Sequence, residues 1–185
     1  MQIQLLNGES DDSKPVDATL VPLHNKHLHD FETFWKNRLR SSSEEDSHWN
    51  WTKKNRLYTS ASGFEKYAIE CSQITQGLMM IAIRGHRSWV ETEQRLVYVD
   101  YLATAPWNRP SIQNPPEYRL VGSTLLQFAR YRSEELGYRG IVGLHALPRA
   151  ARFYEKMGMM NCGPDSEKQN LTYFEWYRER VYPSE

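Results

Sequence analysis

A glycine lies where a proline-rich loop gives way to an amphipathic helix. The stretch 117–138 reads EYRLVGSTLLQFARYRSEELGY, and Gly122 lies at the start of its helical part. A glycine there lets the phosphates of a ligand approach the backbone, where the amides and the positive end of the helix dipole attract an anion. An ordinary turn glycine would look the same. The residue types therefore raise a phosphate site as a hypothesis and leave the structural alternative open.

Three histidines, His24, His27 and His29, lie close together near the start of another predicted helix. Imidazole is a common zinc ligand, but no cysteine accompanies these histidines. We interpret the group as a solvated helix entry and predict no metal site.

Hydrophobic periodicity predicts strands and helices along the whole chain. Apolar residues at helical spacing predict helices at 25–40 and 48–57, a helix ended by Gly137, and a short helix between Pro148 and Gly158. Runs of β-branched and aromatic residues predict strands at 1–6, 64–71, 76–83, 95–104, 141–147 and 171–177. The polar segment 7–17 is predicted to be a loop.

The order of elements between Arg95 and Met160 resembles the GNAT superfamily of acyl-CoA N-acyltransferases. It runs strand, glycine-led loop, helix, strand and helix, and the last helix, PRAARFYEKMGM, is similar to the family's tyrosine-bearing helix. The resemblance implies an α/β fold with a mixed, mostly antiparallel central sheet flanked by helices. We expect one such domain over residues 1–185, with a loop insertion at about 107–119.

The resemblance also implies acetyl-CoA as cosubstrate. In the family, a strand before the loop exposes backbone groups to the pantetheine arm, and Leu102 and Thr104 occupy the matching positions. The pyrophosphate would be held by amides of the glycine loop, those of Val121, Gly122, Ser123 and Thr124.

The glycine loop departs from the family pattern, because the insertion separates Arg109 from Arg119. Counting back from Gly137 matches Gly122 to the family's last glycine and puts Leu120 at the first. Counting from Arg119 instead makes Gly122 the first glycine. Both alignments keep Gly122 in the loop, and they leave open which arginine assists the phosphates.

Three residues are candidates for proton transfer. The resemblance assigns Tyr154 as the donor to the departing thiolate; a core aromatic is its structural alternative. Strand alternation puts Asp100 on one face with Tyr98, so Asp100 is a candidate base, or else the partner of an arginine. His145, at the end of its strand, is either a polar core residue or a second acid/base candidate.

Composition narrows the class of protein. Lysine plus arginine equals aspartate plus glutamate at 23 each, so no overall field favours nucleic acid or an anionic membrane. No apolar run approaches the roughly 20 residues of a membrane-spanning helix. Cys71 and Cys162 are widely separated and the N-terminus has no leader pattern, so we predict a cytoplasmic protein with free thiols.

These observations predict an N-acetyltransferase that moves an acetyl group from acetyl-CoA to a primary amine. The acceptor is a small-molecule amine or a protein amine, and the sequence is compatible with a homodimer. The alternative is a degenerate GNAT-fold module that binds CoA or a partner without catalysis. Leu120 and the split loop motivate that alternative.

Overall fold

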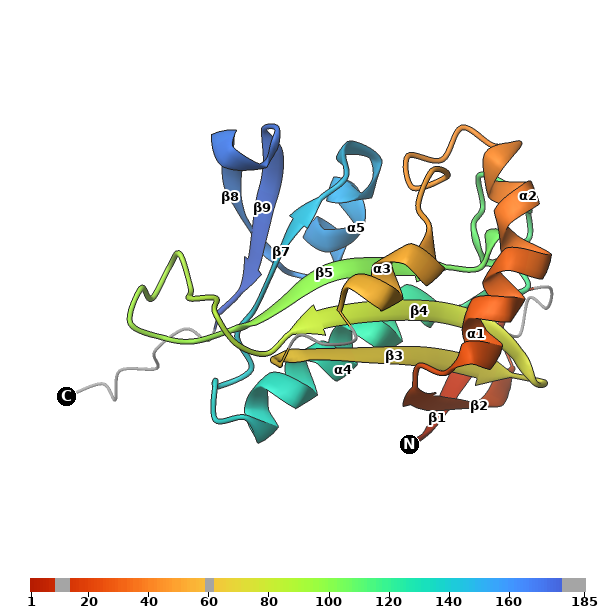
Figure 1. The fold of residues 1–185 in the computed structure, drawn as a ribbon, viewed down its shortest axis with the longest axis horizontal. Coiled ribbons are helices and arrows are strands. Elements are labelled where there is room, and N and C mark those ends of the chain that lie inside the picture. The colour runs from red at the N-terminus through yellow and green to blue at the C-terminus, as the bar shows by residue number, and fades with distance from the viewer. Residues whose placement is uncertain (9–13, 59–61, 178–185) are drawn as a thin grey trace. The chain divides into compact units, whose positions relative to one another are not determined.

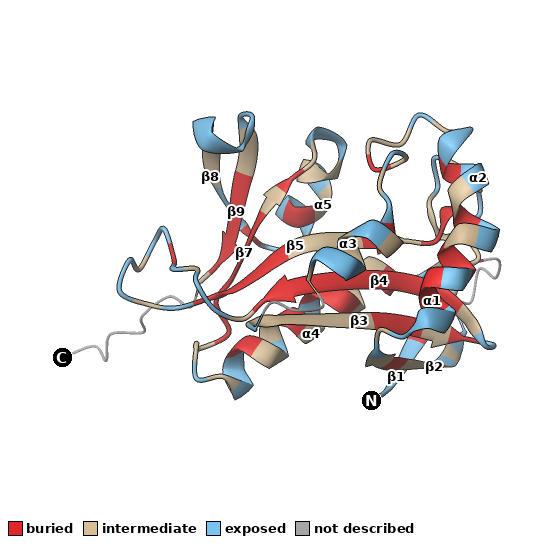
Figure 2. Cartoon of the chain, in the orientation of Figure 1, coloured by how far each residue is buried: buried red, intermediate tan, exposed pale blue. Residues whose placement is uncertain are grey.

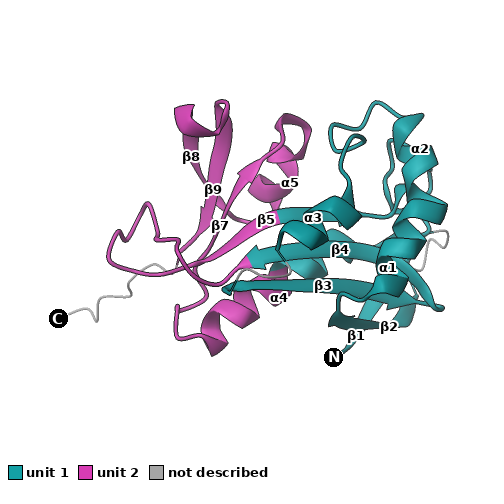
Figure 3. Cartoon of the chain, viewed as in Figure 1, with its two compact units in different colours: residues 1–81, 101–126 teal, residues 82–100, 127–185 magenta. Residues whose placement is uncertain are grey.

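A computed structural model describes residues 1–8, 14–58 and 62–177 of the chain (Figure 1). The chain divides into two compact units (Figure 3). Unit 1 comprises Met1–Ile81 and Tyr101–Leu126, and unit 2 comprises Ala82–Asp100 and Gln127–Glu185. A single domain over the whole chain stays a prediction.

Unit 1 contains a mainly antiparallel sheet. Its strands follow the order β6 (Tyr118–Arg119), β1 (Gln2–Asn7), β2 (Pro15–Pro22), β3 (Phe64–Cys71), β4 (Ile74–Ala82) and the second half of β5 (Val97–Thr104). The predicted strands at 1–6, 64–71, 76–83 and 95–104 are confirmed. Among the described residues, β4 is buried along nearly its whole length (Figure 2).

Two strands of unit 1 were not predicted. β2 begins at Pro15, inside the segment 7–17 that was predicted to be a loop. Proline is tolerated at the first position of a strand, so Pro15 does not prevent the strand from starting there. β6 has two residues and exists through pairing with β1, where Arg119 lies opposite Leu6. This pairing places the end of the expected insertion in the sheet.

Helices cover one face of this sheet (Figure 1). α1 (Asn25–Asp30), a π-helical turn (Phe31–Trp35) and α2 (Lys36–Arg40) are consecutive, which confirms the predicted helix at 25–40. α3 (Trp51–Leu57) confirms the next helix. Aromatic and aliphatic side chains from these helices pack on the strands in one buried cluster, which comprises Leu28, Phe31, Trp35, Leu39, Trp51, Ala68, Leu78, Met80, Ala103, Ala105 and Trp107.

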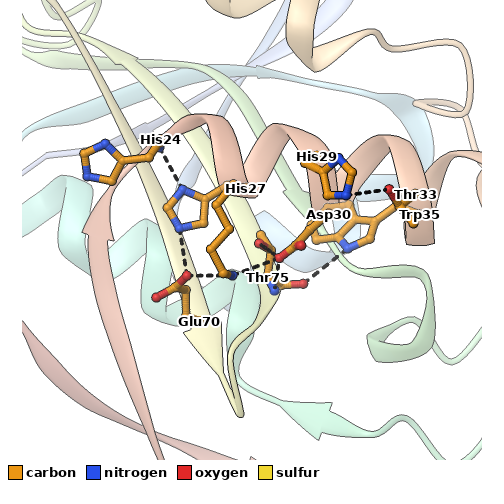
Figure 4. Close-up of polar contacts among 9 residues, drawn as sticks. His24, His27, His29, Asp30, Thr33, Trp35, Glu70 and Thr75 are labelled. Carbon is orange, nitrogen blue, oxygen red and sulfur yellow. Dashed lines mark hydrogen bonds and ion pairs between the residues drawn. The ribbon is translucent and has the colours of Figure 1, made fainter.

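Polar contacts attach α1 to β3 and β4 (Figure 4). Asp30 Oδ2 accepts from the backbone N–H of Thr75 at 3.1 Å and from its hydroxyl at 2.6 Å. His27 Nε2 lies 3.1 Å from Glu70 Oε1, and His27 Nδ1 accepts from the backbone N–H of His24 at 2.8 Å. The histidines therefore lie at a helix entry, as predicted, but the expectation that it is solvated is wrong for His27, which is buried against Glu70, and holds for the exposed His24 and His29.

Unit 2 contains a second set of strands. They follow the order of the first half of β5, β7 (Val142–Ala146), β9 (Leu171–Trp176) and β8 (Met160–Asp165). β5 and β7 are parallel, and the pairs β7–β9 and β8–β9 are antiparallel. The predicted strands at 141–147 and 171–177 are confirmed, whereas β8 was missed. Gly163 and Pro164 disguise β8 in the sequence, and its register shifts between Asn161 and Pro164.

Helices α4 (Val121–Glu135) and α5 (Ala151–Lys156) agree with prediction. A 3₁₀ turn at Pro148–Ala150 leads into α5. Gly137 and Gly158 follow the two helices with φ values of 76° and 77°, the left-handed backbone that glycine adopts without a steric penalty. α4 begins in unit 1 and continues from Gln127 in unit 2.

Strand pairing and layers therefore agree with the predicted fold class, a mixed, mostly antiparallel sheet with helices. Cys71 and Cys162 are free thiols, as predicted. Within the described residues, no helix combines the length and apolarity needed to cross a bilayer.

Candidate active site

A chain of three polar side chains centres on His145 in unit 2. The hydroxyl of Tyr98, on β5, lies 2.7 Å from His145 Nδ1. On the other side of the imidazole, Nε2 lies 2.9 Å from Oδ2 of Asp165, at the end of β8. We call Tyr98, His145 and Asp165 the relay.

The local strand register brings the relay together. In the parallel pair β5–β7, Tyr98 lies opposite Gly143, two residues before His145, so both side chains project from the same face. A Cβ atom on Gly143 would lie 2.1 Å from the Tyr173 hydroxyl oxygen, so any larger residue would displace that ring. Glycine therefore keeps this face open for the rings around His145.

Hydrogen-bonding rules assign the protons of the relay. A carboxylate only accepts, so His145 Nε2 carries the hydrogen that points to Asp165, and Nδ1 accepts from the Tyr98 hydroxyl. When Nδ1 gains a proton, it donates to the same hydroxyl oxygen, because a hydroxyl both donates and accepts. His145 can therefore take up a proton without losing either contact.

Burial sets the protonation of His145 at neutral pH. Desolvation lowers the pKa of His145 below its ordinary value, and Lys168 lowers it further, although the bond to Asp165 opposes both effects. The imidazole is consequently a neutral base near pH 7.

Aromatic rings surround the relay. His145 lies against Tyr173, with ring centroids 5.0 Å apart, and Trp89 stacks on Tyr173 at 4.2 Å. The Tyr173 hydroxyl donates to Glu175 at 2.9 Å, and the fully buried Glu175 also accepts from Ser88 and from the Trp89 backbone. Burial and the Glu175 charge raise the pKa of Tyr173, so this hydroxyl stays protonated and fixes the ring beside His145.

Tyr154 lies on the opposite face of β9 from His145. Its buried ring packs on Phe174 at a centroid distance of 5.8 Å, whereas His145 packs on Tyr173. Successive side chains of a strand point to opposite faces, so the two candidates address different sides of the sheet. Asp100 is half-buried on β5, two residues beyond Tyr98. The roles predicted for Tyr154 and Asp100 stay predictions.

The candidate phosphate site lies at the start of α4 in unit 1. A Cβ atom on Gly77 of β4 would lie 2.7 Å from Val121 and 2.9 Å from Leu125, so glycine lets the first turn of α4 approach the strand closely. Leu120 precedes the helix with φ of 72°, a backbone that favours glycine. This conformation agrees with the alignment that puts Leu120 at the family's first glycine position.

One predicted phosphate donor is already used inside the helix. The Thr124 amide donates to the Leu120 carbonyl at 2.8 Å, which corrects its assignment to a ligand. This is the first i to i−4 bond of the helix, and such a bond leaves only the earlier amides for an anion. The amides of Val121, Gly122 and Ser123 stay candidates for phosphate binding.

Arg109 is committed to contacts within unit 1. Its guanidinium bonds both carboxylate oxygens of Asp46, at 2.6 and 2.8 Å, and Glu44 at 2.9 Å. Burial acts to lower the pKa of Arg109, but bonds to these acids override it and raise the pKa. Sequence reasoning missed this network because Asp46 lies more than 60 residues earlier. Arg119, by contrast, is exposed on β6 and donates to the Gly8 carbonyl at 3.2 Å.

The positions predicted for the pantetheine arm differ in their contacts. Tyr101 and Ala103 pack in the cluster below α1–α3, so Leu102 and Thr104, which alternate with them, point away from it. The Thr104 carbonyl accepts from two nitrogens of Arg109, at 3.0 and 2.8 Å. That carbonyl is therefore occupied, which corrects the expectation that it faces a ligand.

No family model and no curated protein matches the sequence. Solved structures do match. The PaiA N-acetyltransferase of Thermoplasma acidophilum, in complex with coenzyme A, superimposes with a TM-score of 0.60 at 12% identity, over 87% of this chain and 99% of that one.

Two further structures have similar scores. The spermidine N-acetyltransferase of Vibrio cholerae, with CoA and spermine, matches with a TM-score of 0.54 at 16% identity, over 85% of this chain and 92% of that one. A Desulfovibrio desulfuricans protein assigned to the GNAT family of acetyltransferases matches with a TM-score of 0.58 at 12% identity, over 86% and 98%. The predicted GNAT fold is therefore confirmed.

Proposed function

We propose that the chain is an N-acetyltransferase that moves an acetyl group from acetyl-CoA to a primary amine. The observation that carries the proposal is the relay, a base that burial keeps neutral near pH 7. The fold supports it, because similar structures are those of N-acetyltransferases with CoA bound. The hydroxyl on the second nitrogen lets His145 take up a proton without losing either hydrogen bond.

The relay accounts for the proton that the amine must lose. The amine nitrogen attacks the thioester carbonyl carbon, so a C–N bond forms and the C–S bond breaks. The Tyr98 oxygen accepts the proton of the amine while the Tyr98 proton passes to His145 Nδ1. Asp165 stabilises the resulting imidazolium through Nε2. Tyr154 packs on the other face of β9, so its predicted role as proton donor to the thiolate is an alternative to the relay and not a step of it.

We assign the pyrophosphate of CoA to the first turn of α4 in unit 1. The amides of Val121, Gly122 and Ser123 precede the first internal bond of the helix, and the helix dipole adds positive charge. Arg119 is our candidate for the assisting cation, since Arg109 bonds Asp46 and Glu44.

Release of free thiol from acetyl-CoA, measured against a panel of small amines and peptides, tests the activity. We expect turnover in the wild type and a loss in His145→Gln. CoA binding is measured separately by calorimetry, and Gly122→Glu, which adds bulk and negative charge, should weaken it tenfold or more, a loss of about 1.4 kcal/mol. CoA binding without any thiol release would contradict catalysis and favour the binding-module alternative.

A further inference from the structure

A group of arginines surrounds a cavity in the segment that joins β4 to β5, within unit 2. The cavity has a volume of about 410 Å³ and is lined by Arg84, Gly85, His86, Arg87 and Arg95. Three of its five lining residues carry a permanent positive charge, and none is acidic. We call this feature the arginine cavity.

Backbone contacts hold the walls of the arginine cavity. Arg87 and Arg95 form an antiparallel bridge, and the Ser88 amide donates to the Gln94 carbonyl at 3.0 Å. Arg87 also donates from Nη1 to the Glu93 carbonyl at 2.8 Å. Arg87 and Arg95 therefore stand on a closed turn with defined geometry.

Two acidic side chains of unit 2, those of Glu91 and Glu175, bond residues outside the cavity lining. Glu91 bonds Arg139 at 2.8 Å. Glu175 accepts from Ser88, from the Trp89 backbone and from Tyr173. The chain as a whole has no net charge, so the local excess of arginine does not reflect a basic protein.

The arginine cavity is adjacent to the relay. His86 lines the cavity and stacks on Tyr98, with ring centroids 4.3 Å apart and an interplanar angle of 8°. Tyr98 in turn bonds His145. The His86 ring thus lies between the cavity and Tyr98, the residue of the relay to which we assign acceptance of the amine proton.

We propose that the arginine cavity binds a carboxylate or phosphate group carried by the acceptor amine. This inference rests on the proposed acetyltransferase function and names its substrate class, an amine with an anionic group. Guanidinium groups match carboxylate and phosphate oxygens with paired hydrogen bonds, and a cavity of this size is in the range that small ligands occupy. Three guanidinium groups repel a polyamine at the same place.

Matched acceptor pairs test the substrate class. Phosphoethanolamine is compared with ethanolamine, and β-alanine with propylamine, by thiol release from acetyl-CoA. We expect kcat/KM to be at least tenfold higher for each anionic member. The double variant Arg84→Gln/Arg95→Gln should remove that advantage through KM, while turnover of the neutral amines stays unchanged. The control Arg56→Gln removes an exposed charge from α3 in unit 1 and should keep the preference.

Calorimetry separates this inference from the proposed function. Phosphoethanolamine and β-alanine are titrated into the wild type and the double variant without acetyl-CoA, and we expect about tenfold weaker binding in the variant. If binding shows this dependence but no amine is acetylated, the arginine cavity stands and the proposed function fails. If amines are acetylated without anionic preference, or the double variant binds them as the wild type does, the inference is overturned. A loss of CoA affinity in the double variant also overturns it, because the cavity would then serve the cosubstrate.

Discussion

Two buried histidines in this protein each face a carboxylate, and they differ in what meets the second nitrogen. His27 in unit 1 pairs with Glu70, and His145 in unit 2 pairs with Asp165. Burial lowers the pKa of both imidazoles. The Nδ1 of His27 accepts from a backbone N–H, whereas the Nδ1 of His145 faces the Tyr98 hydroxyl.

This difference separates a structural histidine from a chemical one. A backbone N–H only donates, so a proton on Nδ1 of His27 would oppose the His24 amide and break the helix entry. The Tyr98 hydroxyl reverses its role when His145 is protonated. A histidine–carboxylate pair is therefore weak evidence for catalysis until the partner of the other nitrogen is known.

The largest expected effect comes from making the same substitution in both histidines. His145→Gln should lower kcat by about 10²- to 10⁴-fold, the usual contribution of general acid–base catalysis. His27→Gln should leave kcat within about threefold, because the hydrogen bonds of that imidazole go to the His24 amide and to Glu70, in unit 1. Thiol release under saturating acetyl-CoA and amine measures both. Equal losses of kcat in the two folded variants would show that His145 is no more catalytic than His27.

Tyr154→Phe examines the opposite face of β9. It removes the hydroxyl but keeps the ring on Phe174, so the unfolding temperature should change little. If Tyr154 protonates the thiolate, kcat should fall by about 10²-fold or more while CoA affinity stays near normal. If kcat falls by less than about threefold while chemistry limits turnover, Tyr154 is a core residue and not the proton donor.

Tyr98→Phe removes the reversible partner of His145. We expect kcat to fall about tenfold or more, since His145 stays in place but loses the hydroxyl that connects it to the amine. Tyr67→Phe is the control, because its hydroxyl bonds Glu65 in unit 1. Unchanged turnover in Tyr98→Phe would mean that His145 works without this hydroxyl.

The pH profile tests the role of burial at His145. A base with a lowered pKa stays active as the pH falls to the usual histidine value of about 6.5, so the acidic limb of kcat/KM should lie below that value. Asp165 opposes the lowering, so Asp165→Asn should move the limb to still lower pH. An acidic limb that stays in place in Asp165→Asn would exclude His145 as the titrating group.

The smallest effect concerns stability at mildly acidic pH. The pKa of folded His27 lies below its unfolded value, so the unfolded chain binds more protons and stability falls as the pH drops below about 6.5. His27→Gln should lower stability near pH 7 by about 1 kcal/mol through lost hydrogen bonds and weaken that pH dependence. Denaturant unfolding at several pH values measures both. An unchanged slope would show that other groups dominate acid destabilisation.

Local pattern was enough to predict most elements and one member of the relay. The strands carrying Tyr98 and His145, the helix with Tyr154 and the terminating glycines are evident from periodicity and turn chemistry, since side-chain spacing and backbone preference are local properties. Strand β8 was missed, and with it Asp165, because Gly163 and Pro164 oppose a strand locally and only pairing with β9 stabilises it. The ion pair between Arg109 and Asp46 was missed for a similar reason, since the residues next to Arg109 in the chain give no sign of a partner 63 residues away.

By itself, the sequence determined the order of most elements, without β2, β6 and β8, the glycine at the entrance to α4 and the presence of a histidine at the end of a strand. Tertiary structure decided which of these groups meet. It brought Arg109 into contact with Asp46 and with the Thr104 carbonyl, and His145 into contact with Tyr98 and Asp165. Three arginines scattered over twelve residues became one cavity beside Tyr98. The physical reason is that a residue's charge, tautomer and accessibility depend on its neighbours in space, which strand register selects and local sequence does not encode.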